Sequence, residues 1–86
     1  MPKPGVFCRW ESTTRYYLAG LEQDLLDDWV VVQRWGGKAT GLGSHQVVVV
    51  GSETEGLRRL VAVAKVRARR GYRLVDGPSP LPLSPA

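Results

Sequence analysis

The residues best suited to chemistry lie in one glycine-rich stretch, R-W-G-G-K-A-T-G-L-G at positions 34–43. Its arginine and lysine can pair with phosphate oxygens, and its tryptophan offers a flat face on which a sugar or base can stack. Glycines allow positive φ angles and close approach of a ligand to the backbone. The stretch therefore suits a phosphate-bearing ligand, although a flexible hairpin loop would use the same glycines.

The spacing excludes two familiar phosphate-binding loops. A P-loop needs a glycine five residues before its Gly-Lys pair and Ser or Thr directly after it. Val32 and Ala39 occupy these two positions. A dinucleotide-binding turn needs a third glycine three residues after Gly43, where Gln46 stands, and a helix directly after the loop. What remains is a connection between two antiparallel strands.

The sequence contains no catalytic or metal-binding constellation. Cys8 is the only cysteine and His45 the only histidine, so neither an internal disulfide nor a thiolate zinc site can form. No nucleophile is accompanied by a base, and the adjacent acids Asp27 and Asp28 suit a turn. We expect no catalytic residue, no metal, no cofactor and no enzymatic activity, with Cys8 acting as a small buried hydrophobe.

Length and charge limit the possible partners. The chain has 86 residues, enough for one domain, with net charge +4 and a sequence pI of about 9.7. Acids cluster at 22–28, whereas the basic residues from 58 to 73 have no acid among them. A one-sided positive field suits nucleic acid, and a solvated helix face would account for it equally. Without a long apolar run or a signal segment, we expect a soluble cytoplasmic protein, and a composition rich in Arg, Gly, Val and Ala suggests a bacterial source.

Strand-like segments fill the first half of the chain. Four of them have aromatic and β-branched composition: 6–10, 15–22, 29–35 and 46–50. Alternation along the third places Trp29 and Trp35 on one face and Arg34 on the other. Trp35 could therefore pack on Trp29 instead of meeting a ligand. The four valines at 47–50 suggest a strand buried on both faces.

One helix follows these strands. Ser52 and Glu55 have the spacing of a capping box, and Gly71 suits the helix end. The apolar residues expected to face the core are Leu57, Leu60, Val61, Ala64 and Ala68. Val63 and Val66 lie off this stripe and could contact the chain's own termini or another protein, which hints at a partner face.

These elements predict an α+β fold, a small antiparallel β-sheet with one α-helix packed across a face. Residues 72–75 can return as a short extended segment. We expect a loose N-terminus at 1–8, a domain at 9–75 and a disordered proline-rich tail at 76–86.

The series of motifs resembles the WGR domain, a module of poly(ADP-ribose) polymerases and many bacterial proteins. Trp35 and Gly36 match the first two letters of the Trp-Gly-Arg motif, and Tyr17 matches the tyrosine of the first strand. Further matching positions are Gly41, Gly43, Lys65 and Arg70-Gly71-Tyr72. The third motif letter, arginine, is replaced by Gly37, with Lys38 one residue later.

The resemblance, which covers about residues 9–75, implies binding to double-stranded DNA at ends or nicks. It implies that Trp35 stacks near a strand end and that Gly36 lets the DNA backbone approach. It also implies phosphate contacts from Lys38 and Arg34, with Arg15 adding another beside Tyr17. The alternative is a protein–protein adaptor that binds no nucleic acid, which the missing motif arginine favours. The sequence leaves the oligomeric state open.

Overall fold

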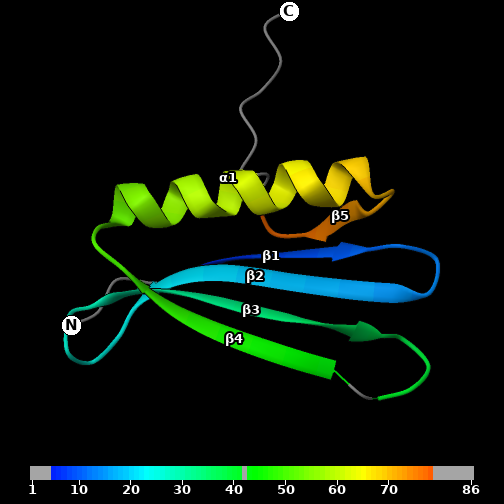
Figure 1. The fold of residues 1–86 in the computed structure, drawn as a ribbon, viewed down its shortest axis with the longest axis horizontal. Coiled ribbons are helices and arrows are strands. Elements are labelled where there is room, and N and C mark those ends of the chain that lie inside the picture. Colours follow the sequence, from blue (N-terminus) through cyan, green and yellow to red (C-terminus); the bar gives the residue numbers. More distant parts are fainter. Residues whose placement is uncertain (1–4, 42, 79–86) are drawn as a thin grey trace, which may run out of the picture.

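Within residues 5–41 and 43–78, which the computed structural model describes, one helix lies across one face of a five-stranded antiparallel sheet (Figure 1). The elements in chain order are β1 (Val6–Glu11), β2 (Arg15–Gln23), β3 (Trp29–Gly37), β4 (Gly43–Val50), α1 (Glu53–Arg69) and β5 (Arg73–Asp76). The strand order across the sheet is β4-β3-β2-β1-β5. The predicted α+β fold is thus confirmed.

The ordered part is longer at both ends than the expected 9–75. Residues 6–8, expected to be loose, form the start of β1, which lies between β2 and β5 instead of at an edge. The Cys8 side chain is fully buried, as expected of a small hydrophobe, and its thiol donates to the Pro78 carbonyl at 3.0 Å. Asp76, expected in the tail, ends β5. The remaining parts of the predicted termini, 1–4 and 79–86, lie outside the described residues.

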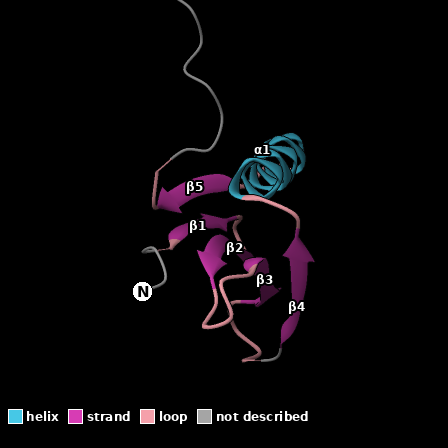
Figure 2. Ribbon diagram, turned by 90° about the vertical axis from the view of Figure 1, so that its left-hand side faces the viewer, coloured by secondary structure: helices cyan, strands magenta, loops and turns pink. Residues whose placement is uncertain are grey.

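The core lies between α1 and the sheet face that α1 covers; Figure 2 shows the helix and the sheet from the side. Alternating strand residues point into it because successive side chains of a strand leave opposite faces. Its buried members are Cys8, Trp10, Ala19, Leu21, Val31, Val50, Leu60 and Ala64. No second helix covers the other face within the described residues. Val47 and Val49 are exposed on this face, whereas Val30 is buried.

The helix begins close to where the sequence indicates. The Ser52 side chain accepts from the Glu55 backbone N–H at 3.1 Å, which satisfies one of the free donors of the first turn. The Glu55 carboxylate reaches back to the Gly51 N–H at 2.6 Å, one residue further than a capping box places it. Gly71 follows the last turn with a φ of +83°, the left-handed conformation that glycine favours.

The buried stripe of α1 is rotated from the predicted one. Gly56, Leu60 and Ala64 are buried, whereas Leu57 and Ala68 are exposed. The Leu21 side chain occupies the space that a side chain at position 56 would need. Val63, which was expected to lie off the apolar stripe, is partly buried and packs against the core.

The expected burial of all four valines in β4 is also wrong. Val50 is buried and Val48 packs against the core, whereas Val47 and Val49 are exposed. The reason is topological: β4 is an edge strand, and α1 covers only one face of the sheet.

Candidate functional site

Trp35 stacks on Tyr17 at one end of the sheet face that α1 covers. The two residues are direct neighbours in the register of β2 and β3. Their ring centres lie 5.8 Å apart with an angle of 14° between the planes, an offset-stacked arrangement. Trp10 meets the Tyr17 ring edge-on at 6.4 Å. The alternative that Trp35 packs on Trp29 is wrong, since the two tryptophans stand at opposite ends of β3 and about 20 Å apart along it.

Arg67 extends this stack from the helix. Its guanidinium carbon lies 4.3 Å from the centre of the Tyr17 ring and 4.9 Å from that of Tyr72, within reach of a cation–π interaction. The turn after α1 places Tyr72, whose backbone N–H donates to the Arg67 carbonyl at 2.9 Å. Among the described residues, the buried Nε of Arg67 has no hydrogen-bond partner. The order of side chains is therefore Trp35, Tyr17, Arg67 and Tyr72.

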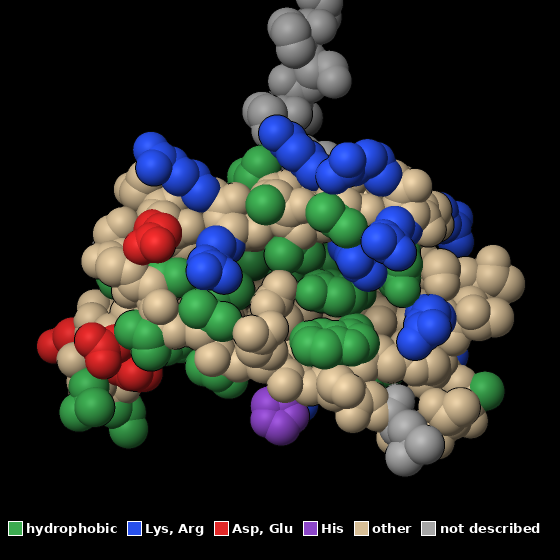
Figure 3. Space-filling model, in the orientation of Figure 1, with side chains coloured by type: hydrophobic (Ala, Val, Ile, Leu, Met, Phe, Trp, Pro, Cys, Tyr) green, Lys and Arg blue, Asp and Glu red, His purple; other side chains and the backbone are tan. Residues whose placement is uncertain are grey.

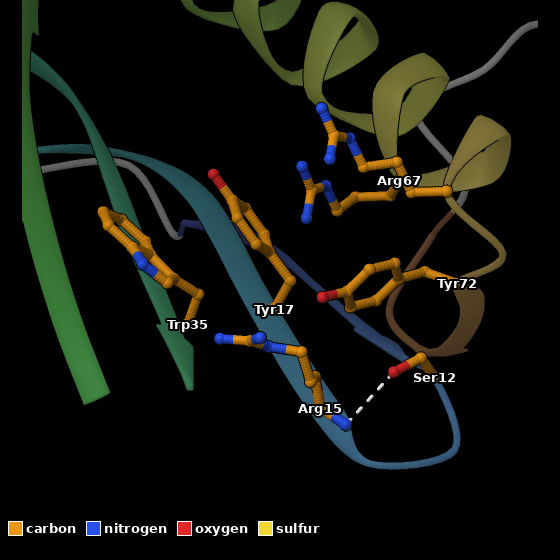
Figure 4. Close-up of a pocket in the computed structure, with 7 residues that line it drawn as sticks. Ser12, Arg15, Tyr17, Trp35, Arg67 and Tyr72 are labelled. Carbon is orange, nitrogen blue, oxygen red and sulfur yellow. Dashed lines mark hydrogen bonds between the residues drawn. The ribbon is translucent and has the colours of Figure 1, made fainter. Parts of the chain in front are cut away.

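These four side chains line an open hollow of about 770 Å³ (Figure 4). Ser12, Arg15 and Arg70 complete its lining. The Ser12 hydroxyl accepts from the Arg15 backbone N–H at 3.1 Å, which fixes the β1–β2 turn, and the Arg15 side chain extends toward Trp35. Within the described part of the chain, none of the three arginines is paired with a carboxylate.

A second hollow of about 550 Å³ continues from the first beneath the glycine-rich loop. Arg15 and Trp35 line both hollows. The remaining lining is small or polar: Thr14, Gly36, Gly37, Ala39, Thr40, Gly43 and Ser44. The loop is tied to the β1–β2 turn, because the Lys38 backbone N–H donates to the Thr14 carbonyl at 2.8 Å. Together the hollows form a groove with Trp35 and Arg15 at its middle.

The structure brings four of the six predicted site residues to this groove and separates the other two. Trp35, Gly36, Arg15 and Tyr17 line it. Lys38, by contrast, forms an ion pair with Glu11, Nζ to Oε1 at 2.9 Å.

Arg34 lies on the sheet face away from α1, where it borders two smaller hollows with Tyr16, Glu22 and Phe7 among their linings. The strand alternation that placed Arg34 opposite Trp35 was correct. A single ligand could contact both Trp35 and Arg34 only if it extended around the edge of the sheet.

Neighbouring residues change the pKa values of two groups in or near the groove, Tyr17 and Glu11. Burial raises the pKa of the Tyr17 hydroxyl, an effect that the nearby Arg67 charge opposes, and this hydroxyl accepts from Gln33 Nε2 at 3.1 Å. Hydrogen bonds from Lys38 and Arg9 lower the pKa of the Glu11 carboxyl, so Lys38 stands beside a carboxylate that stays ionised. Lys and Arg side chains gather along α1 and at the end of the sheet that carries the groove (Figure 3).

Ser12, Arg67, Arg70 and Tyr72 were not among the predicted site residues. A signal existed for Arg67, which follows Leu60 by seven residues and Ala64 by three, so helical spacing places it on the buried side of α1. A charged side chain at such a position must find partners or meet a ligand. For Ser12 no comparable signal exists, since only the β1–β2 turn brings it to the groove.

No three His, Cys, Asp or Glu side chains among the described residues gather as a metal site would require. The helix found in the described chain is neither long nor apolar enough to cross a membrane. Comparison of the sequence and structure with protein-family models, curated proteins and solved structures gave no match.

Proposed function

We propose that this chain is a non-catalytic DNA-binding module that recognises duplex ends or nicks through backbone contacts and one aromatic stack. The observation that supports this most is the groove itself, where three arginines with no carboxylate partner in the described part of the chain surround stacked aromatic rings. Cationic side chains beside an aromatic platform suit a polyanion that also presents flat sugar or base faces.

Phosphate contact falls to Arg15, Arg67 and Arg70. A guanidinium presents a planar fork of donors that matches phosphate oxygens. Stacking on Tyr17 and Tyr72 holds Arg67 in place before any ligand arrives, so little side-chain freedom is lost on binding. The groove uses these arginines in place of Lys38, whose ammonium group is paired with Glu11.

The preference for ends or nicks follows from the position of Trp35. One side of its ring stacks on Tyr17, and the neighbouring groove is lined by small residues that include Gly43 and Ser44. Inside a continuous duplex, each base is covered by its neighbours, whereas a terminal or nicked nucleotide leaves a face free for an aromatic side chain.

The test measures fluorescence anisotropy of labelled DNA at low and moderate salt. It compares a duplex with a 5′-phosphorylated end, a nicked duplex and a duplex closed by hairpins at both ends. We expect the first two to bind more tightly than the closed duplex. Three phosphate contacts predict that a plot of log binding constant against log salt concentration has a slope of about −3, since each contact contributes about −0.9.

Trp35→Ala is the informative variant, and Trp35→Phe is its matched control because it keeps an aromatic ring on Tyr17. We expect the alanine variant to lose about 1–3 kcal/mol of binding free energy and the phenylalanine variant to lose less. Equal affinity for open and closed duplexes, or no binding at low salt by the folded protein, would contradict the proposal.

One observation favours the alternative, a protein–protein adaptor. Leu25 and Leu26, at the β2–β3 turn, are 90% and 81% exposed. The Asp24 carboxylate holds this turn by accepting from the Leu26 and Asp28 backbone N–H groups, each at 2.9 Å. An apolar contact through these leucines would be far less sensitive to salt than phosphate contacts are.

A further inference from the structure

The two edges of the sheet differ in how they are protected against pairing with another strand. An exposed edge offers free backbone N–H and C=O groups, and natural proteins usually block it with charge, proline, a bulge or a short strand. The edge at β5 is short, carries Arg73 and Asp76, and is followed by Pro78. The edge at β4 spans eight residues and pairs with β3 without a register shift.

The β4 edge has none of these protective features. Residues 43–50 contain no Lys, Arg, Asp, Glu or Pro. Val47 and Val49 are 56% and 64% exposed on the sheet face away from α1. Among the described elements nothing lies beyond β4, which forms the lower border of the sheet in Figure 1.

We propose that the outer edge of β4 pairs antiparallel with the β4 edge of a second copy of this chain, so that one sheet continues through both copies. This surface is separate from the groove of the proposed function and does not depend on it.

A second copy suits this edge in both charge and chemistry. Two copies of this chain, each with a net charge of +4, repel each other in most relative orientations. The β4 edge carries no formal charge, so two copies can approach each other through it with less repulsion. β-branched residues such as valine favour strand pairing. A two-fold axis pairs this edge with itself and closes the assembly at two copies.

Symmetry also determines which registers are possible. Residues directly opposite each other in an antiparallel pair point to the same sheet face, and a two-fold axis perpendicular to the sheet keeps each face on its own side. The axis must therefore pass between a residue and its own copy. Placing it at Val47, the middle of residues 44–50, sets Val47 opposite the second copy's Val47. His45 then faces Val49, and Gln46 faces Val48. This register uses residues 44–50, a seam of about 24 Å.

Such a seam is short, so the association belongs to the weak class that buries less than about 1,200 Å². Both helices would lie on the same side of the joined sheet. Trp35 pairs with Ser44 near the start of β4, so the two grooves would lie toward opposite ends of the seam.

The experiment measures sedimentation velocity of the whole chain over a range of concentrations up to roughly 1 mM, the Kd scale of a weak association. Val47→Lys places two like charges directly opposite each other across the axis, which destabilises strand pairing. Val75→Lys is the matched control, because Val75 is a 46% exposed valine on the other edge strand, β5. Thermal melts establish that both variants are folded.

We expect a discrete dimer for the wild type and the Val75→Lys variant, and a Kd at least roughly tenfold higher for Val47→Lys, as for a loss of about 1.4 kcal/mol. Val47→Glu alone should be equally weak, and an equimolar mixture of the Lys and Glu variants should recover the dimer. A monomer throughout, an open-ended series of oligomers, equal sensitivity of both edges, or no recovery in the mixture would each overturn the proposal.

Discussion

The guanidinium carbon of Arg67 lies 4.3 Å from the centre of the Tyr17 ring, which joins the last turns of α1 to β2. Tyr17 stacks on Trp35 on its other side in the sheet. The same contact therefore contributes to packing of the helix and holds a cation at the wall of the groove. Loss of this contact should affect both stability and binding.

Replacing Arg67 with lysine tests this double role. The substitution keeps the charge but removes the planar group that stacks between Tyr17 and Tyr72. We expect the free energy of unfolding to fall by about 0.5–2 kcal/mol, the range of a partly desolvated cation–π contact. Urea denaturation measures this, and Arg59→Lys, at an exposed position on the same helix, is the control. A variant as stable as the wild type would show that stacking contributes nothing.

Replacing Arg15 and Arg34 one at a time tests which sheet face meets DNA. Arg15 lines both parts of the groove, whereas Arg34 lies on the opposite face. We expect Arg15→Gln to weaken binding and to reduce the salt slope by about 1, the loss of one phosphate contact. Arg34→Gln should change neither. If Arg34→Gln has the larger effect in the anisotropy titration, the open face is the binding face.

The Cys8 thiol should be nearly inert in the folded protein. Burial raises its pKa, and its Sγ is hydrogen-bonded to the Pro78 carbonyl, so the reactive thiolate is disfavoured. The neutral Cys8 thiol contributes its full stabilisation at any pH below the pKa that the thiol has in the unfolded chain. This stabilisation is lost as the pH rises through the higher pKa that the thiol has in the folded protein. Iodoacetamide should label Cys8 slowly near pH 8 and rapidly in urea. Equal labelling rates would contradict its burial.

Adding a methyl group at Gly56 should loosen the contact between α1 and the sheet. A Cβ there would overlap the Leu21 side chain, which is 2% exposed and has little room to move. Overpacking costs about 1–3 kcal/mol, whereas alanine gains about 1 kcal/mol in helix propensity over glycine. We expect Gly56→Ala to lower the melting temperature, and Leu21→Val in the same chain to recover part of the loss. A higher melting temperature for Gly56→Ala alone would contradict the close packing.

The sequence indicated the type of each element because the relevant signals are local. Alternation and β-branched residues predicted four strands, and the capping residue Ser52 with Gly71 bounded the helix. The same alternation separated Trp35 from Arg34 correctly. The wrong predictions concerned which side chains are buried. Neither the exposure of Val47 and Val49 in β4 nor the rotation of α1 could be predicted, because both depend on contacts with residues from other parts of the chain.

The sequence by itself determined an α+β fold with one helix and a basic character, and it offered no recognisable catalytic set. Only the tertiary structure decided that Trp35 stacks on Tyr17, that Arg67 and Tyr72 join them, and that Lys38 turns away to Glu11. These contacts depend on strand register and on the packing of Gly56 against Leu21. Both are settled by fitting side chains across elements far apart in the sequence, for which short-range periodicity holds no signal.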